Sequence, residues 1–203
     1  MKPRLLFALL PLLPLAAVPA AADFKTDTRS VKLDYLQNEV TVIFETDGVG
    51  IEKVTPLCDC ITARIDGSRL IARVDSSKFS RDIDKQIDAR TADGKTTRLT
   101  IRFSVPALYT VSCPSLVWQK GSARTPQVLR ITIPEGSPVH NIERAELVGK
   151  GFDYEPRIVR KGREYTITVT PQTTAKPVLA RLRLVTDCSD YRARCTIYLQ
   201  VKR

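Results

Sequence analysis

The sequence predicts an all-β fold in which two tandem sandwich domains follow a signal peptide. Apolar and polar residues alternate along many short segments, as they do in half-buried strands. Gly, Pro, Asn and Asp separate these segments, and no helical period is sustained between Asp23 and Arg203. The segments fall into two halves of seven. Because a seven-stranded unit of about 100 residues is the size of an immunoglobulin-like sandwich, we expect two such domains.

The first half carries the stronger strand signals. Segment 39–46 (EVTVIFET) is rich in β-branched residues, and segments 61–65 and 69–74 flank an Asp-Gly-Ser turn, as the arms of a hairpin do. A second hairpin is expected around the turn 92–95. The expected strands of this half are 31–36, 39–46, 51–55, 61–65, 69–74, 86–91 and 97–105.

The second half has the same organisation. Glycine-containing turns are expected at 149–151 and 161–162, and a proline-flanked loop at 171–177. The expected strands are 115–118, 127–133, 142–148, 154–159, 164–170, 178–186 and 194–201.

The two halves look like an internal duplication. The run from Ile51 (IEKV) resembles the run from Ile142 (IERA), and Thr91 corresponds to Thr186 at nearly the same offset. A single large barrel is the alternative architecture, and the near-constant offset argues against it. We therefore expect immunoglobulin-like domains at 23–107 and 108–203, with the boundary near 104–108.

Residues 1–22 are predicted to be a secretory signal peptide. Lys2 and Arg4 precede an apolar run at 5–18, and three alanines at 20–22 form a cleavage site before Asp23. Prolines interrupt the run, which is too short for a comfortable membrane span. We expect a periplasmic or secreted protein whose mature chain has no membrane anchor.

The chain is basic, with a formal net charge of +10, to which the leader contributes Lys2 and Arg4. The cations are scattered at alternate strand positions, as in 98–103, which is typical of a solvated sheet face. Such an excess favours anionic partners such as envelope polymers. Specific nucleic-acid binding is not expected, because no recognition motif is present.

Cys58 and Cys60 are the closest pair of reactive side chains in the sequence. On a strand, the period of two would place both thiols on one face and Asp59 on the other. A structural role is the leading interpretation, in a disulfide or as small buried residues. The alternatives are thiol exchange and binding of a soft metal such as copper, for which Cys58 and Cys60 would be the ligands. Zinc would need further ligands, and the single histidine, His140, lies in the other half.

The other three of the five cysteines lie in the second half. Cys188 and Cys195 flank a tight hairpin, where facing Cβ atoms approach within disulfide range, so we predict a Cys188–Cys195 disulfide. Cys113 precedes Pro114 at the expected domain boundary. It remains unassigned: it either pairs with Cys58 or Cys60 or stays free.

No catalytic pattern stands out. The sequence lacks a G-x-S-x-G elbow, an H-E-x-x-H pair, a phosphate-binding loop and a dinucleotide fingerprint. His140 is interpreted as an exposed loop histidine. The aromatic residues on strands are interpreted as core or interface residues, namely Phe44, Phe103, Trp118, Tyr165 and Tyr198.

Residues 44–105 resemble a bacterial family known as domain of unknown function 1573, whose hallmark is a β-rich segment followed by C-x-C. The matching residues are Phe44, Gly48, Ile51, Val54, Cys58, Cys60 and Thr62, followed by the closing hairpin 87–105. The resemblance implies export and an immunoglobulin-like fold, and it supplies no activity. Asp59 stands where the family commonly has glycine, and 149–151 (GKG) stands near the position of a second cysteine pair. Only the first half can therefore inherit a role for the pair.

These observations predict an exported, non-enzymatic tandem module that binds an envelope protein or polymer through strand edges or loops. No cofactor is expected. The alternative is a periplasmic thiol- or copper-handling protein that uses Cys58 and Cys60.

Overall fold

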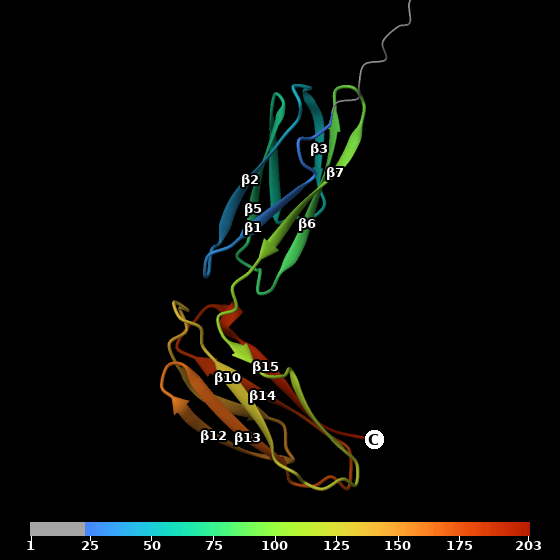
Figure 1. Ribbon diagram of the computed structural model, residues 1–203. Coiled ribbons are helices and arrows are strands. Elements are labelled where there is room, and N and C mark those ends of the chain that lie inside the picture. The colour runs from blue at the N-terminus through green and yellow to red at the C-terminus, as the bar shows by residue number, and fades with distance from the viewer. Residues whose placement is uncertain (1–22) are drawn as a thin grey trace, which may run out of the picture.

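The computed structural model describes residues 23–203 as two β-rich halves that lie end to end (Figure 1). The predicted signal peptide, residues 1–22, lies outside the described residues. The halves are joined by residues 105–109, and each forms two sheets with its own core.

The first half is a seven-stranded sandwich. One sheet has the order β1-β7-β6-β3 and the other β2-β5-β4. Strand β1 runs parallel to β7, and the other pairings are antiparallel. The strands are β1 (Thr28–Lys32), β2 (Glu39–Glu45), β3 (Ile51–Pro56), β4 (Ile61–Asp66), β5 (Arg69–Asp75), β6 (Ile83–Thr91) and β7 (Thr96–Ser104).

The second half has eight strands and one 3-10 turn. Its sheets have the orders β12-β13-β10-β8 and β11-β14-β15-β9, and β9 runs parallel to β15. The elements are β8 (Thr110–Val111), β9 (Ser115–Gln119), β10 (Gln127–Thr132), β11 (Ile142–Val148), β12 (Phe152–Arg160), β13 (Glu164–Pro171), β14 (Val178–Thr186), η1 (Tyr191–Ala193) and β15 (Cys195–Lys202).

Both halves have immunoglobulin-like topology. From β2 and from β10 onward, successive strands occupy the same places in the two sheets, and the second half reproduces the A-B-E-D and C-F-G arrangement of immunoglobulin sandwiches. The repeat extends to ladder details. Ile51 pairs with Thr91 and Ile142 pairs with Thr186, and each pair is followed at once by a register shift. The predicted fold class is thus confirmed.

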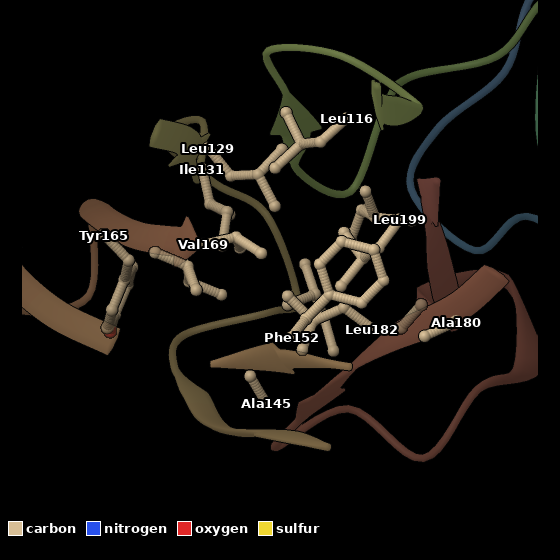
Figure 2. Packing of buried hydrophobic residues seen from close by; sticks show 14 of the residues in the cluster. Leu116, Leu129, Ile131, Ala145, Phe152, Tyr165, Val169, Ala180, Leu182 and Leu199 are labelled. Carbon is tan, nitrogen blue, oxygen red and sulfur yellow. The ribbon is translucent and has the colours of Figure 1, made fainter. Parts of the chain in front are cut away.

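Alternation of side chains builds the two cores. Strand β13 is buried at every second residue from Tyr165 to Pro171, which follows from the two-residue period of a strand. Figure 2 shows residues of the second core, where Phe152 meets Leu182 and Leu199 from the opposite sheet. Trp118 is buried beside Phe152 and donates its indole N–H to the Thr125 carbonyl at 2.7 Å.

Most of the expected aromatic core residues are buried, but Tyr198 is not. It lies on the outer face of β15 and is 46% exposed, because the inward positions of that strand are Ile197, Leu199 and Val201. Tyr198 is therefore not a core residue, and its expected alternative role, packing at an interface, stays a prediction. His140 lies in an exposed loop, as predicted.

The expected strand at 31–36 begins and ends earlier in the structure, at Thr28–Lys32. The chain turns after Leu33: the Gln37 amide donates to the Asp34 carbonyl, and the Asp34 amide donates to the Gln37 side chain. Leu36 has a φ of 56°, which alternating hydrophobicity does not reveal. The two-residue strand β8 and the turn η1 were not predicted either.

Candidate functional sites

Cys58 and Cys60 are joined in a disulfide, with their Cα atoms 5.3 Å apart. They lie in the turn that crosses from β3 in one sheet to β4 in the other, rather than on a strand. Both are half-buried against the first core, while Leu57 and Asp59 beside them are exposed. The pairing is one of the outcomes that the leading structural interpretation allowed, and the two cysteines lie in a turn rather than on the strand that would place both sulfurs on one face.

Backbone hydrogen bonds fasten this cysteine turn (residues 57–60) to both sheets. The Leu57 amide donates to Gln86 of β6 at 3.1 Å, and the Asp75 amide of β5 donates to the Cys60 carbonyl at 2.8 Å. The Ile61 amide closes the turn on the Cys58 carbonyl. The turn is therefore held in place by bonds other than its disulfide.

In this form the pair is not a copper site, because each sulfur is bonded to the other and neither is a thiolate. Residues 23–203 contain no group of three or more His, Cys, Asp or Glu side chains that could hold a metal. Metal binding at Cys58 and Cys60 would first require reduction of the disulfide.

The second sandwich makes the equivalent crossover, from β11 to β12, with glycine instead of cysteine. Gly149 and Gly151 have φ values of +114° and +94°, and the chain lies directly against the start of β14. A Cβ on Gly151 would come within 2.8 Å of the Val178 side chain, and one on Gly149 within 3.0 Å of Ala180. The same crossover is therefore built without a disulfide.

Gly151→Ala is expected to destabilise the second sandwich by about 2 kcal/mol, combining backbone strain with the Val178 clash. Gly121→Ala is the matched control, since Gly121 has a φ of +78° but nothing within 4 Å of an added Cβ, and about 1 kcal/mol is expected. Urea unfolding followed by Trp118 fluorescence measures both. Equal losses for the two variants would contradict the role assigned to the contact with β14.

Cys188 and Cys195 are free thiols, so the disulfide predicted between them is not formed. The register explains this. Cys195 faces Leu184 in the β14–β15 ladder, whereas Cys188 lies beyond the end of β14, and η1 inserts a 3-10 turn between the two cysteines. The simple hairpin that would have brought their Cβ atoms together does not exist. Cys113 is free as well.

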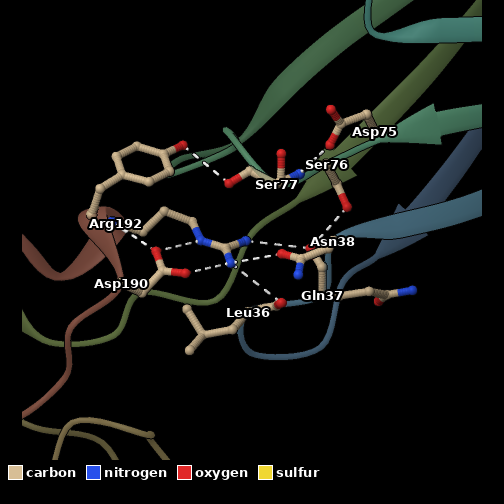
Figure 3. Close-up of polar contacts among 9 residues, drawn as sticks. Leu36, Gln37, Asn38, Asp75, Ser76, Ser77, Asp190 and Arg192 are labelled. Carbon is tan, nitrogen blue, oxygen red and sulfur yellow. Dashed lines mark hydrogen bonds and ion pairs between the residues drawn. The ribbon is translucent and has the colours of Figure 1, made fainter.

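A set of contacts that we call the junction clasp joins the two sandwiches (Figure 3). Arg192 of η1 reaches the β1–β2 turn, donating to the Asn38 side chain at 2.9 Å and to the carbonyls of Leu36 and Gln37 at 3.3 Å. Asp190 holds the guanidinium through two hydrogen bonds of 2.9 Å. The Arg192 side chain is only 7% exposed. Because the guanidinium is buried and hydrogen-bonded on both sides of the junction, it fixes the orientation of the β1–β2 turn relative to η1.

Each sandwich contributes residues to the clasp that contact the other sandwich. Tyr35 and Leu36 of the β1–β2 turn pack against the core of the second sandwich, and the Tyr191 hydroxyl donates to the Ser77 carbonyl of the first. A cavity of about 290 Å³ lies beside these contacts, between the two sandwiches. Its wall includes Phe79, Tyr109 and Arg192. Sequence patterns gave no sign of the clasp, because its partners lie far apart in the chain.

The flank of the second sandwich between β11 and β12 is open, and we call this groove the open flank. It has a volume of about 470 Å³. Tyr154, Pro156 and Ile158 of β12 pair with buried residues of β13 and therefore face inward, yet Ile158 is 61% exposed. The apolar wall of the groove includes Ile131, Ile142, Ala145, Tyr154, Ile158 and Ile167.

The first sandwich closes the corresponding flank. There β3 packs against β4, while β11 and β12 have almost no backbone contact. Across the open flank, the Tyr154 hydroxyl donates to the Ala145 carbonyl at 3.0 Å. The two repeats differ most at this edge, although they share a topology.

The far end of β12 is basic and apolar. Val159 is 52% exposed, and Arg157, Arg160 and Lys161 take part in none of the ion pairs found within residues 23–203. Neighbouring cations are paired: Arg130 binds Glu164, and Arg163 binds Glu135. The edge therefore presents unpaired positive charge beside exposed hydrophobic side chains.

No family model matches this chain, and no curated protein matches it. Solved structures with a similar arrangement include a chimeric titin Z1Z2 functionalised with a decorin peptide, at 12% identity and a TM-score of 0.35, covering 90% of this chain and 96% of that one. The titin tandem A164–A165 is similar at 11% identity and a TM-score of 0.35, with the same coverages of 90% and 96%.

The S-layer protein SbsC, domains 4 and 5, is similar at 10% identity and a TM-score of 0.33, covering 77% of this chain and 72% of that one. Scores of this size carry no argument about the function of this chain, and the fold assignment rests on its own strand order. In residues 23–203 no helix is long and apolar enough to cross a membrane.

Proposed function

We propose that this protein is an exported, non-enzymatic binding module of the cell envelope, and that its open flank takes up an extended, acidic segment of a second envelope protein. The observation that carries the proposal is Ile158, which faces inward on β12 and is nevertheless 61% exposed. A large apolar side chain that is exposed to solvent on an edge strand indicates a surface that binds another molecule.

An extended polypeptide is the partner that this edge fits. The free side of an edge strand offers backbone N–H and C=O groups in a row, which a strand of another protein can pair with while its alternate side chains enter a groove. Pro156 lacks an N–H and protects the middle of β12. We place the pairing at 157–160, the stretch beyond Pro156 that begins beside the apolar groove and carries the unpaired cations.

The unpaired positive charge at the end of β12 favours an acidic partner, because Glu143 in the groove wall is already paired with Arg144. Arg157, Arg160 and Lys161 lie at this end of β12 without ion-pair partners in the described chain, and the whole sequence carries a net charge of +10. Negative charge on the partner would speed its association with this surface and slow its dissociation. Added salt screens the attraction and should reduce both effects.

Ile158→Lys is expected to weaken binding of a labelled peptide of alternating apolar and glutamate residues by about tenfold or more, because the apolar contact is lost and like charge is added near the groove. Fluorescence anisotropy measures the affinity. Ile65→Lys is the matched control, because Ile65 lies on β4, the equivalent strand of the first sandwich. It is expected to leave binding unchanged.

Three further probes make the test decisive. A peptide with lysine in place of glutamate is expected to bind at least tenfold more weakly, and high salt is expected to weaken binding of the acidic peptide. An anionic polysaccharide tests the polymer alternative. Binding of the polysaccharide alone, or equal losses for Ile158→Lys and Ile65→Lys, would exclude an extended protein segment at the open flank.

The proposed export rests on the leader at 1–22 and on the resemblance of 44–105 to an exported family. Expression of the full chain, followed by fractionation and intact mass measurement, tests it. We expect a mature chain that begins at Asp23 in the periplasm or medium. An unprocessed chain retained inside the cell would contradict export.

A further inference from the structure

We infer that the cysteine turn is a thiol–disulfide exchange site, at which the Cys58–Cys60 disulfide accepts electrons from a dithiol of another protein. This inference does not depend on the open flank, which lies on the other sandwich. It rests on three features of the turn: the disulfide is not needed to build the crossover, its two cysteines are only half-buried where they pack against the first core, and an exposed apolar residue stands next to it.

The first feature is redundancy. Three backbone hydrogen bonds already tie the turn to β6, to β5 and to itself. The second sandwich makes the same crossover through Gly149 and Gly151, with no disulfide at all. A bond between residues two positions apart closes a very short loop, so it removes little conformational freedom from the unfolded chain. The disulfide therefore contributes little as a staple of the fold.

The second feature is access. Cys58 and Cys60 are half-buried in a surface turn, with exposed Asp59 between them. Structural disulfides that resist exchange lie under other elements, out of reach of an attacking thiolate. Here no strand covers the turn on its outer side, since β3 and β4 are the end strands of their sheets.

The third feature is a docking contact. Leu57 is 46% exposed immediately before Cys58, although large apolar residues of the described chain are mostly buried. An apolar side chain beside the sulfurs gives a substrate segment a surface to rest on while exchange takes place. Leu57 is therefore assigned as a positioning residue for the incoming chain.

The reaction balances without a cofactor. A thiolate of the partner dithiol attacks one sulfur of the Cys58–Cys60 bond, forming a mixed disulfide and releasing the other cysteine as a thiolate, which takes up a proton. The second partner thiolate then attacks the partner's own sulfur in the mixed disulfide. The products are an oxidised partner disulfide and the Cys58, Cys60 dithiol, so two electrons and two protons pass to this protein.

The test uses the full mature chain and a synthetic peptide that carries two cysteines. The reduced peptide is mixed with folded protein, samples are quenched in acid and alkylated, and intact mass and peptide mapping count the thiols. We expect peptide oxidation to match the appearance of two alkylated residues, Cys58 and Cys60, while circular dichroism stays native. Peptide oxidation should be at least about tenfold slower with the Cys58→Ser/Cys60→Ser variant.

Two controls separate exchange from general thiol reactivity and from unfolding. Cys188→Ser/Cys195→Ser keeps the cysteine turn and removes two free thiols, so it should oxidise the peptide at the parent rate. Leu57→Ser should slow exchange with the peptide but leave reduction by small glutathione unchanged. The inference is overturned if the disulfide stays closed to both reductants until denaturant is added, or if its reduction unfolds the first sandwich.

Discussion

Phe44→Ala is expected to unfold the first sandwich selectively, at a cost of about 3–5 kcal/mol. Phe44 is completely buried on β2, within the core that β5, β6 and β7 build around it. Removing its ring leaves a cavity that close-packed neighbours fill only in part. Since small domains are stable by only about 5–15 kcal/mol, this loss is a large fraction of the total.

The chain carries its own reporter for this experiment. Trp118 is the single tryptophan and lies in the second core, so its fluorescence follows only the second sandwich, whereas far-ultraviolet circular dichroism follows both. In Phe44→Ala, the dichroism transition in urea should split, and its first phase should shift more than the fluorescence midpoint, which loses only the contacts of the clasp. Leu182→Ala, in the second core, should shift the fluorescence midpoint instead, by about 2–5 kcal/mol. A common shift of both signals in Phe44→Ala would show that the two cores unfold as one unit.

Arg192→Met is expected to release the two sandwiches from their fixed orientation, with a loss of about 3 kcal/mol from the junction. Methionine keeps the apolar stem but removes every donor, so the carbonyls of Leu36 and Gln37 and the Asn38 side chain lose their partner across the junction. Small-angle scattering measures the result as a broader distribution of distances. The control is Arg194→Met, since Arg194 is exposed and outside the clasp.

The clasp should also open in acid. The Arg192 guanidinium, through its hydrogen bonds, holds the pKa of Asp190 below its ordinary value. A depressed pKa means that the carboxylate contributes stability above the ordinary carboxyl pKa of about 4, and that this contribution is lost as pH falls through the depressed value. Scattering curves should therefore be constant above about pH 5 and broaden below about pH 4. An Arg192→Met protein that shows the same acid broadening would contradict this cause.

Alternation of apolar and polar residues predicts the strands of this chain better than its turns and its cysteine pairing. Alternation placed both arms of the hairpin β4–β5 and matched Ile51 to Ile142, which occupy equivalent ladder positions. It failed at 33–38, where hydrogen bonds within a turn and the contact of Leu36 with the second core outweigh the strand pattern. It also suggested the wrong disulfide, because the register of β14 and β15 depends on pairing along the whole ladder.

The sequence by itself determined the period, the number and the order of most strands, and hence two immunoglobulin-like sandwiches. These follow from local rules: side chains alternate between faces, and glycine, proline and aspartate mark turns. Only the tertiary structure decided the Cys58–Cys60 pairing, the clasp around Arg192 and the open flank beside Ile158. Each of these depends on how separate segments meet in space, and the free energy of such contacts is set by burial and by partners that no local pattern specifies.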